Sequence, residues 1–231
     1  VLGRGFHKQA GSGHAEVNAL KQAGAEVAGA TVFVSLEPCS FVGRTPACAQ
    51  TLIDAGVARV VIAAVDPNPQ VSGQGINMLR GAGISVEAIE LQSAKDCIQG
   101  FASRITRGRP FVRLKTATSL DGAVALANGA SQWITGAAAR SDVQYWRARS
   151  DAVITGVGSV LADDCQLTVR APIFSEAHAP LRVVLDNHGR TPLNAKVLDG
   201  QAPTVLMHKQ GCDTAELAAA EHVQQVFLPD G

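Results

Sequence analysis

Short runs rich in β-branched residues alternate with alanine-rich stretches in the first half of the chain, and this alternation limits the folds open to it. The runs at 31–36, 59–65 and 84–88 have the length and composition of buried strands. Helices are expected between them, near 14–23, 46–55, 74–82 and 94–105. Strands that alternate with helices form a mostly parallel sheet with helices on both faces, so we expect an α/β fold.

The segment 107–110 interrupts this rhythm with two arginines, a glycine and a proline, and we interpret it as a domain boundary. A chain of 231 residues has room for two modest domains, which we place at 1–106 and 111–231. In the second domain we expect a helix at 137–149 and strands at 111–116, 152–155, 181–186 and 204–207. A further short strand should end near Leu228.

The charge balance argues for a small-molecule partner. The chain carries 20 basic and 20 acidic residues, a formal net charge of zero, with no basic stripe of the kind that neutralises nucleic-acid phosphates. The longest apolar run, 60–65, is far shorter than the roughly 20 residues of a membrane span. Five cysteines without a disulfide framework favour a reducing compartment, which we expect to be the cytoplasm. Three of them, at 97, 165 and 212, have no ligand spacing and are interpreted as small apolar residues.

One histidine and two cysteines form a candidate metal site. His14 opens a His-Ala-Glu triplet, and Cys39 follows a proline nine positions before Cys48. A Cys₂His set suits Zn²⁺ and leaves a fourth position open for water, as in a catalytic site. Glu16 lies two residues from His14, so it does not share a helix face with it and is not expected to be a ligand. It is placed instead to take a proton from the attacking water.

The environment of Cys48 supports this interpretation. Thr45 and Pro46 predict a helix N-cap followed by proline at the first helical position, which puts Cys48 in the first turn, where thiolate is favoured. Either half of the motif alone is most simply a chance match or a pair of packing thiols. A purely structural zinc site would need a fourth cysteine or histidine at ligand spacing, and the sequence offers none there.

The stretch from Glu37 to Cys48, with eight residues between its two cysteines, resembles the motif of the riboflavin-pathway deaminase family, and so does 66–69 with its following glycines. The resemblance implies a cytidine-deaminase-like three-layer α/β/α domain. It also implies hydrolysis of the exocyclic 2-amino group of a diaminopyrimidinone ribosylamine phosphate. By the same resemblance His7, Arg44 and Asp66 contact substrate. Phe41 stands where the family has histidine, and the family's N-terminal part is expected to be missing here.

Motifs at 113–122, 131–135, 156–164 and 167–170 together resemble the reductase half of the same bifunctional family, whose fold is similar to dihydrofolate reductase. The pair Gly156 and Gly158 after a strand lacks the third glycine of a dinucleotide fingerprint, so by itself it is most simply a tight turn. The resemblance nevertheless implies a partial dihydrofolate-reductase-like α/β domain that binds NADPH and lacks its C-terminal part.

The resemblance also assigns roles in this second domain. It gives the cofactor site Ala117, Trp133, Ser159 and Asp163. It gives the substrate Ser131, Arg147, Leu167 and Arg170, with Lys115 and Asp121 completing the pocket. A planar guanidinium suits a phosphate monoester, which is a physical reason for the two arginines. Taken alone, the tryptophan suggests core packing and the arginine at 147 a solvated helix face.

Two other functions compete with this one. A deaminase of free or tRNA-borne bases would use the same zinc chemistry, and a non-catalytic zinc-stabilised module would use only the metal. Zero net charge, the cysteine spacing and the reductase motifs favour the riboflavin enzyme. The sequence leaves open whether the protein is a monomer or a homo-oligomer.

We expect the 231-residue chain by itself to lack full reductase activity, because the family continues beyond the last residue with a glycine-rich segment at the cofactor. Incubating the chain with the pathway substrate and following NADPH oxidation tests this. Robust oxidation would contradict the expectation.

Overall fold

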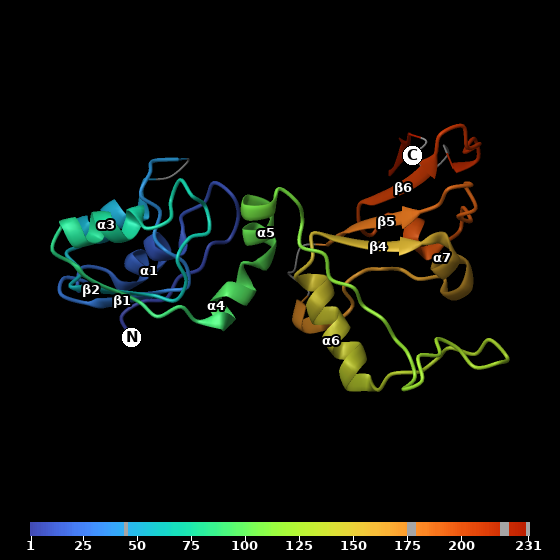
Figure 1. Ribbon diagram of the computed structural model, residues 1–231, viewed down its shortest axis with the longest axis horizontal. Coiled ribbons are helices and arrows are strands. Elements are labelled where there is room, and N and C mark those ends of the chain that lie inside the picture. Colours follow the sequence, from blue (N-terminus) through green and yellow to red (C-terminus); the bar gives the residue numbers. More distant parts are fainter. Residues whose placement is uncertain (44–45, 175–178, 218–221, 230–231) are drawn as a thin grey trace. The chain divides into compact units, whose positions relative to one another are not determined.

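The computed structural model describes residues 1–43, 46–174, 179–217 and 222–229, and the chain divides into two compact units, Val1–Leu114 and Lys115–Gly231 (Figure 1). This division lies a few residues beyond the boundary expected at 107–110. Both units have an α/β fold with parallel sheets, as expected. In the part of the chain that the structure describes, no helix is long and apolar enough to cross a membrane.

The first unit is built on a three-stranded parallel sheet. Its strands are β1 (Thr31–Val34), β2 (Arg59–Ile62) and β3 (Ser85–Ala88), in the order β1-β2-β3. Val32 pairs with Val60, which in turn pairs with Val86. The helices α1 (Ala15–Ala23), α2 (Cys48–Asp54) and α3 (Gln74–Gly81) alternate with these strands. These six elements were all predicted; β1 and β2 end earlier than predicted, and β3 ends at Ala88 as predicted.

Branched side chains between β2 and two helices form the core of this unit. Val60 and Ile62 lie on one face of β2, and Leu52 of α2 and Leu79 of α3 pack against them with no exposed surface. Burial of these positions explains why the sequence of β2 is a short apolar run. The packing also fixes the start of α2 against the sheet, which matters for the site below.

The single helix predicted at 94–105 is wrong, because the chain forms two helices, α4 (Gln92–Cys97) and α5 (Gln99–Arg107). Ile98 between them leaves the helical region at φ −109°. Gly100 follows the break and is a poor helix former. The Asp96 carboxylate accepts hydrogen bonds from the side-chain amides of Gln92 and Gln99, one on each helix.

The second unit holds a four-stranded parallel sheet in the order β4-β5-β6-β7. The strands are β4 (Ala152–Gly156), β5 (Leu181–Leu185), β6 (Thr204–Lys209) and β7 (Val223–Leu228). Its helices are α6 (Ala137–Ala148), α7 (Val157–Asp163) and the short 3₁₀ turns Pro172–Phe174 and Lys196–Leu198. The core lies between Val157 and Val160 of α7 and the fully buried Val184 and Leu206 of the sheet.

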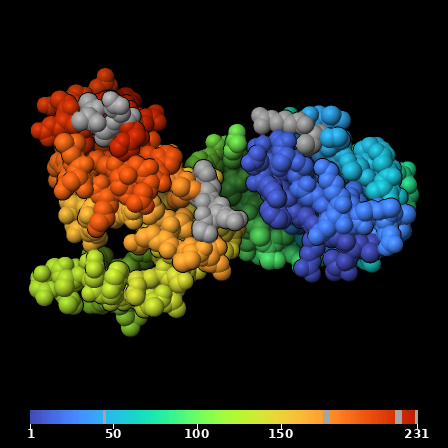
Figure 2. Space-filling model, turned by 180° about the vertical axis from the view of Figure 1, so that it is seen from behind, coloured from blue at the N-terminus to red at the C-terminus, as the bar shows by residue number. Residues whose placement is uncertain are grey.

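Two expectations for this unit need correction. A tight turn was expected at Gly156 and Gly158, but β4 runs directly into α7 with Gly156 as the N-cap. The strand predicted at 111–116 is not formed. Val112 and Leu114 are 80% and 85% exposed, and a strand needs a neighbouring strand to satisfy its backbone groups. Figure 2 shows the yellow-green segment beyond residue 115 standing apart from the orange sheet of its unit.

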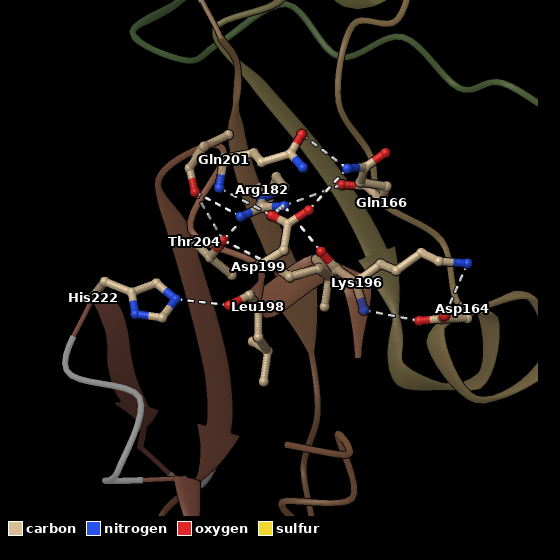
Figure 3. Close-up of polar contacts among 11 residues, drawn as sticks. Asp164, Gln166, Arg182, Lys196, Leu198, Asp199, Gln201, Thr204 and His222 are labelled. Carbon is tan, nitrogen blue, oxygen red and sulfur yellow. Dashed lines mark hydrogen bonds and ion pairs between the residues drawn. The ribbon is translucent and has the colours of Figure 1, made fainter. Parts of the chain in front are cut away.

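A fully buried arginine joins two strands to the loop after Lys196–Leu198 (Figure 3). The Arg182 guanidinium on β5 donates to the Asp199 carboxylate at 2.8 Å, to the Thr204 hydroxyl at 2.9 Å and to the Ala202 carbonyl at 2.7 Å. A buried charge is tolerated only when its donors are satisfied in this way. Loss of the guanidinium would leave the Asp199 carboxylate without its cationic partner.

We expect Arg182→Met to lower the free energy of unfolding by about 3 kcal/mol, because the buried oxygen atoms that accepted hydrogen bonds from the guanidinium would lose their donors. Urea denaturation followed by circular dichroism measures the change. Lys196→Met is the matched control, since the Lys196–Asp164 ion pair is 63% and 48% exposed and should contribute less than about 1 kcal/mol. Equal losses in the two variants would show that burial of the first pair is unimportant.

Candidate metal centre

Three segments of the first unit bring their metal-ligating side chains together. His14 is the N-cap of α1, Cys39 lies in the loop after β1, and Cys48 is the first residue of α2. The His14 Nδ1 atom lies 3.2 Å from the Cys48 Sγ and 3.8 Å from the Cys39 Sγ. All three ligand atoms fall within 4.8 Å of one another. The residues singled out in the sequence therefore converge on one point.

This spacing fits a tetrahedral ion. With zinc bonds of 2.0–2.1 Å to nitrogen and 2.3 Å to sulfur, neighbouring ligand atoms lie about 3.6–3.8 Å apart. The observed distances bracket that value. An imidazole and two thiols are also the ligand types that zinc prefers, so the residues present fit the metal. Three ligands leave one position for a small molecule.

The start of α2 differs from the sequence prediction in an informative way. The helix begins at Cys48 with Ala47 as N-cap, so Pro46 precedes the helix, and Thr45 lies outside the described residues. The backbone N–H of Cys48 donates to the Cys39 Sγ at 3.3 Å, and that of Ala49 donates to the Cys39 carbonyl at 3.1 Å. Cys39 thus satisfies N–H groups of the first turn, in place of a side-chain cap. Cys48 does lie in that first turn, as predicted.

The two thiols influence each other's protonation. The hydrogen bond from the Cys48 side chain lowers the pKa of Cys39 to about 6, against the effect of burial, with further help from the Cys48 N–H and from His14. The same bond, with burial and the Glu16 charge, raises the pKa of Cys48. Without metal the Cys39 thiol is therefore the more acidic of the two, and Cys48 is the thiol that donates the shared hydrogen bond. A bound metal would take both sulfurs as thiolates and release a proton.

Glu16 lies beside this cluster without joining it. It is half-buried in the first turn of α1, and its carboxylate acts on the Cys48 thiol strongly enough to raise the pKa of that group. The convergent ligand atoms belong to His14, Cys39 and Cys48. A carboxylate next to a metal site but outside its ligand set is available for proton transfer.

The residues expected to contact substrate in this unit have different surroundings. The rings of His7 and His14 meet edge to face with centroids 5.1 Å apart, so His7 lies next to the cluster. Asp66 is buried, and burial and the nearby Glu37 charge raise the pKa of its carboxyl. Phe41 is exposed. Arg44 lies outside the described residues.

Sequence reasoning gave no role to Glu37, which the structure shows to be buried with its carboxylate hydrogen-bonded to three backbone N–H groups. The only signal for it in the sequence is its place, directly after the predicted strand 31–36 and directly before Pro38. Asn18 was missed as well. Its amide donates to the carbonyls of Phe6 and Gly13 and so holds the segment that carries His7.

In the second unit the structure places Arg147 beside the segment 168–170, whereas Leu167 is buried in the hydrophobic core. The Arg147 guanidinium on α6 donates to the Thr168 carbonyl at 2.9 Å, and the Gln144 side chain of the same helix accepts from the Arg170 N–H at 2.8 Å. Burial, with the nearby Arg170 charge, lowers the pKa of Arg147. Two neighbouring guanidinium groups repel each other unless an anion lies between them, so this corner suits a phosphate.

The other predicted residues of this unit are spread over two places. Ser159 and Asp163 are exposed on α7, four residues apart and therefore on one face. Trp133 is 70% exposed, with the Arg140 guanidinium 4.5 Å from its ring centroid. The remaining four lie on the irregular segment before α6, where two are half-buried and two are exposed: Ala117, Ser131, Lys115 and Asp121.

Family comparisons agree with this geometry. Residues 1–64 match the model described as the cytidine and deoxycytidylate deaminase zinc-binding region. The first unit is thus cytidine-deaminase-like, and the matched segment carries all three candidate metal ligands, His14, Cys39 and Cys48. Residues 110–230 match the RibD C-terminal domain model, which covers more than half of the chain. The chain belongs to the RibD family.

Curated relatives support the same assignment. The chain is 42% identical over 230 residues to the riboflavin biosynthesis protein RibD of Aquifex aeolicus, covering 99% of this chain and 64% of the relative. It is 47% identical over 206 residues to RibD of Escherichia coli, covering 84% of this chain and 56% of the relative. The chain therefore spans less than two thirds of the length of these relatives.

Solved structures are similar too. One form of RibD from Acinetobacter baumannii is 50% identical with a TM-score of 0.84, covering 98% of this chain and 64% of that one. A diaminohydroxyphosphoribosylaminopyrimidine deaminase/5-amino-6-(5-phosphoribosylamino)uracil reductase from Thermotoga maritima is 36% identical with a TM-score of 0.85 and the same coverage.

We expect iodoacetamide to alkylate Cys39 faster than Cys48 in the metal-free protein. The lowered pKa of about 6 makes Cys39 a thiolate above that pH, so its rate should rise from pH 5 to 7 and then level off, while Cys48 stays protonated and buried. Peptide mass spectrometry after timed quenching measures both rates. Cys97 is exposed and gives an internal reference for a freely accessible thiol. Zinc should protect both site cysteines, and faster alkylation of Cys48 would contradict the assignment of the charge.

Proposed function

We propose that this protein is a bifunctional enzyme of riboflavin biosynthesis that works in the cytoplasm. Residues 1–106 form a zinc-dependent deaminase domain acting on 2,5-diamino-6-(5-phosphoribosylamino)pyrimidin-4-one. Residues 111–231 belong to a reductase domain that uses NADPH to convert the ribosyl side chain of the product to ribityl. The observation that carries the proposal is the convergence of His14, Cys39 and Cys48 beside a carboxylate, in a chain of the RibD family.

In the deaminase domain His14, Cys39 and Cys48 hold the metal, and Glu16 moves protons. Bound zinc supplies the Lewis acidity that lets water act as a nucleophile at neutral pH. Glu16 accepts a proton from that water as its oxygen attacks the ring carbon bearing the amine. The carboxyl delivers this proton to the ring nitrogen. It then takes the remaining proton from the new hydroxyl group and passes it to the departing amine, so that the C–N bond breaks, the carbonyl forms and ammonia leaves. The balanced result is one water consumed, one ammonia released and a ring carbonyl formed.

The residues around this centre bind the substrate. His7 lies edge-on to the His14 ring and so stands next to the candidate metal ligands. Asp66 offers a carboxylate to the ring, and Arg44 offers a guanidinium to the phosphate. Phe41 is exposed and stands where the family that this chain resembles has histidine. It therefore offers the substrate an aromatic ring and no polar group.

In the reductase domain the paired guanidinium groups of Arg147 and Arg170 bind the substrate phosphate. Ser131, Leu167, Lys115 and Asp121 complete that pocket. Ser159 and Asp163 lie on the helix that follows the carboxyl end of a parallel strand, the edge where such sheets bind their ligands, and with Ala117 and Trp133 they would hold NADPH. NADPH supplies the hydride for the reduction.

Deamination of free or tRNA-borne bases is the nearest alternative. It is disfavoured by the zero net charge, because binding of tRNA draws its affinity from neutralised phosphates. An assay of ammonia release from cytidine, from adenosine in tRNA and from the pathway pyrimidine separates the substrates. Release from tRNA in preference to the pyrimidine would overturn the proposal.

We expect Glu16→Gln to keep zinc and to lower ammonia release from the pathway pyrimidine by at least about 100-fold, because it removes only the group that transfers protons. Metal content by atomic absorption and ammonia release by a coupled assay measure the two effects. Glu26→Gln is the matched control, since Glu26 is exposed in the turn after α1 and should change neither value. A non-catalytic zinc module would predict equal behaviour of both variants.

A further inference from the structure

The Glu37 carboxylate holds a whole loop by its backbone. The side chain is 3% exposed, and its Oε2 atom accepts from the N–H groups of Gly73 at 2.9 Å and Asp66 at 3.3 Å. Its Oε1 atom accepts from the N–H of Ile76 at 3.2 Å. These donors span the loop that leads from the strand β2 region into α3. One carboxylate therefore sets the position of both ends of that loop.

A second contact locks the same pair of segments. At Gly75 an added Cβ would lie 2.0 Å from the Pro38 carbonyl oxygen and 3.3 Å from the Glu37 side chain. Only glycine lets the start of α3 approach the Glu37–Pro38 backbone this closely. The loop is thus pressed against two successive residues, and the next residue in the chain is Cys39.

These contacts link the position of Asp66 to that of Cys39. The Asp66 backbone is bound to Glu37, and the Asp66 carboxylate accepts from the Asn68 N–H at 2.8 Å, which restricts the orientation of that side chain. Cys39 lies two residues beyond Glu37 in the same loop after β1. A shift of the Glu37 side chain would move Asp66 relative to the ligand sulfur, although neither residue would lose its own chemistry.

We propose that Glu37 is a positioning residue for deamination, which fixes the distance between the Asp66 carboxylate and the metal centre and thereby sets the affinity for the pyrimidine. The inference rests on the proposed function. Glu37 itself touches neither metal nor substrate. A side chain needed only to fill this volume would be apolar, because burying a carboxylate costs free energy that its hydrogen bonds must offset. The charge is explained by what its acceptors hold in place.

The test is a double-mutant cycle in the full-length protein with the pathway pyrimidine. Glu37→Gln preserves size but puts an N–H₂ group where a carboxylate oxygen accepted a backbone hydrogen bond. We expect zinc content to be unchanged, KM to rise by roughly 10-fold or more and kcat to change by less than about 3-fold. Asp66→Asn should raise KM by itself. The double variant should have the KM of Asp66→Asn alone, because Glu37 acts through Asp66.

Two further variants complete the test. Gly75→Ala displaces the loop without altering any carboxylate and should raise KM as Glu37→Gln does. Asp186→Asn is the matched control, since Asp186 is a fully buried carboxylate of the second unit that accepts from two backbone N–H groups and a hydroxyl. It should lower thermal stability and leave the KM for deamination unchanged.

Several outcomes would overturn the inference. These are an unchanged KM in folded Glu37→Gln, additive effects in the double variant, or loss of folding in both Glu37→Gln and Gly75→Ala, which would assign the contacts to the fold alone. Failure of the proposed function is distinguishable, because the unaltered protein would then bind no zinc or release no ammonia from the pyrimidine.

Discussion

The hydrogen bond from the first turn of α2 to the Cys39 sulfur is the contact on which the rest of the first unit depends. It places a helix start against the loop after β1 and brings two thiols close enough to share a proton. Packing of Leu52 on β2 keeps α2 in that position, so the core and the site are one arrangement. His14, which is the N-cap residue of α1, completes the cluster. The candidate metal centre therefore depends on the packing of two helix starts against the loop after β1.

The sequence predicted most of this arrangement because its signals are local. β-branched runs predicted β1 to β3, and the ligand types at positions 14, 39 and 48 predicted their convergence. The failures arise where tertiary contacts decide. The helix α2 starts at Cys48 because Cys39 caps it. This contact joins residues nine positions apart, so the local signals of Thr45 and Pro46 could not reveal it. The segment 111–116 has the composition of a strand but no partner strand, and Glu37 reads as an ordinary surface carboxylate until its three donors are seen.

Buried charge is used differently in the two units. Arg182 satisfies its donors with side chains and carbonyls of its own sheet and the adjoining loop, and these contacts hold the fold of the second unit together. Glu37 accepts from the backbone of the loop that carries Asp66, the carboxylate that we propose to contact the substrate. Sequence alone does not separate the two cases, since each is a single charged residue near a run of apolar ones. The identity of the partners separates them.

Every neighbouring pair of strands in both sheets runs parallel. Among the described residues no hairpin joins two strands of either sheet, so each pairing must wait until an intervening segment has closed a loop. Such topologies have contacts that are distant in sequence and fold slowly, with unpaired strands exposed in the meantime. Newly made chains of this protein should therefore benefit from chaperones during synthesis. In the first unit the unpaired strands should be exposed for a shorter time when zinc is available to bind the three ligands.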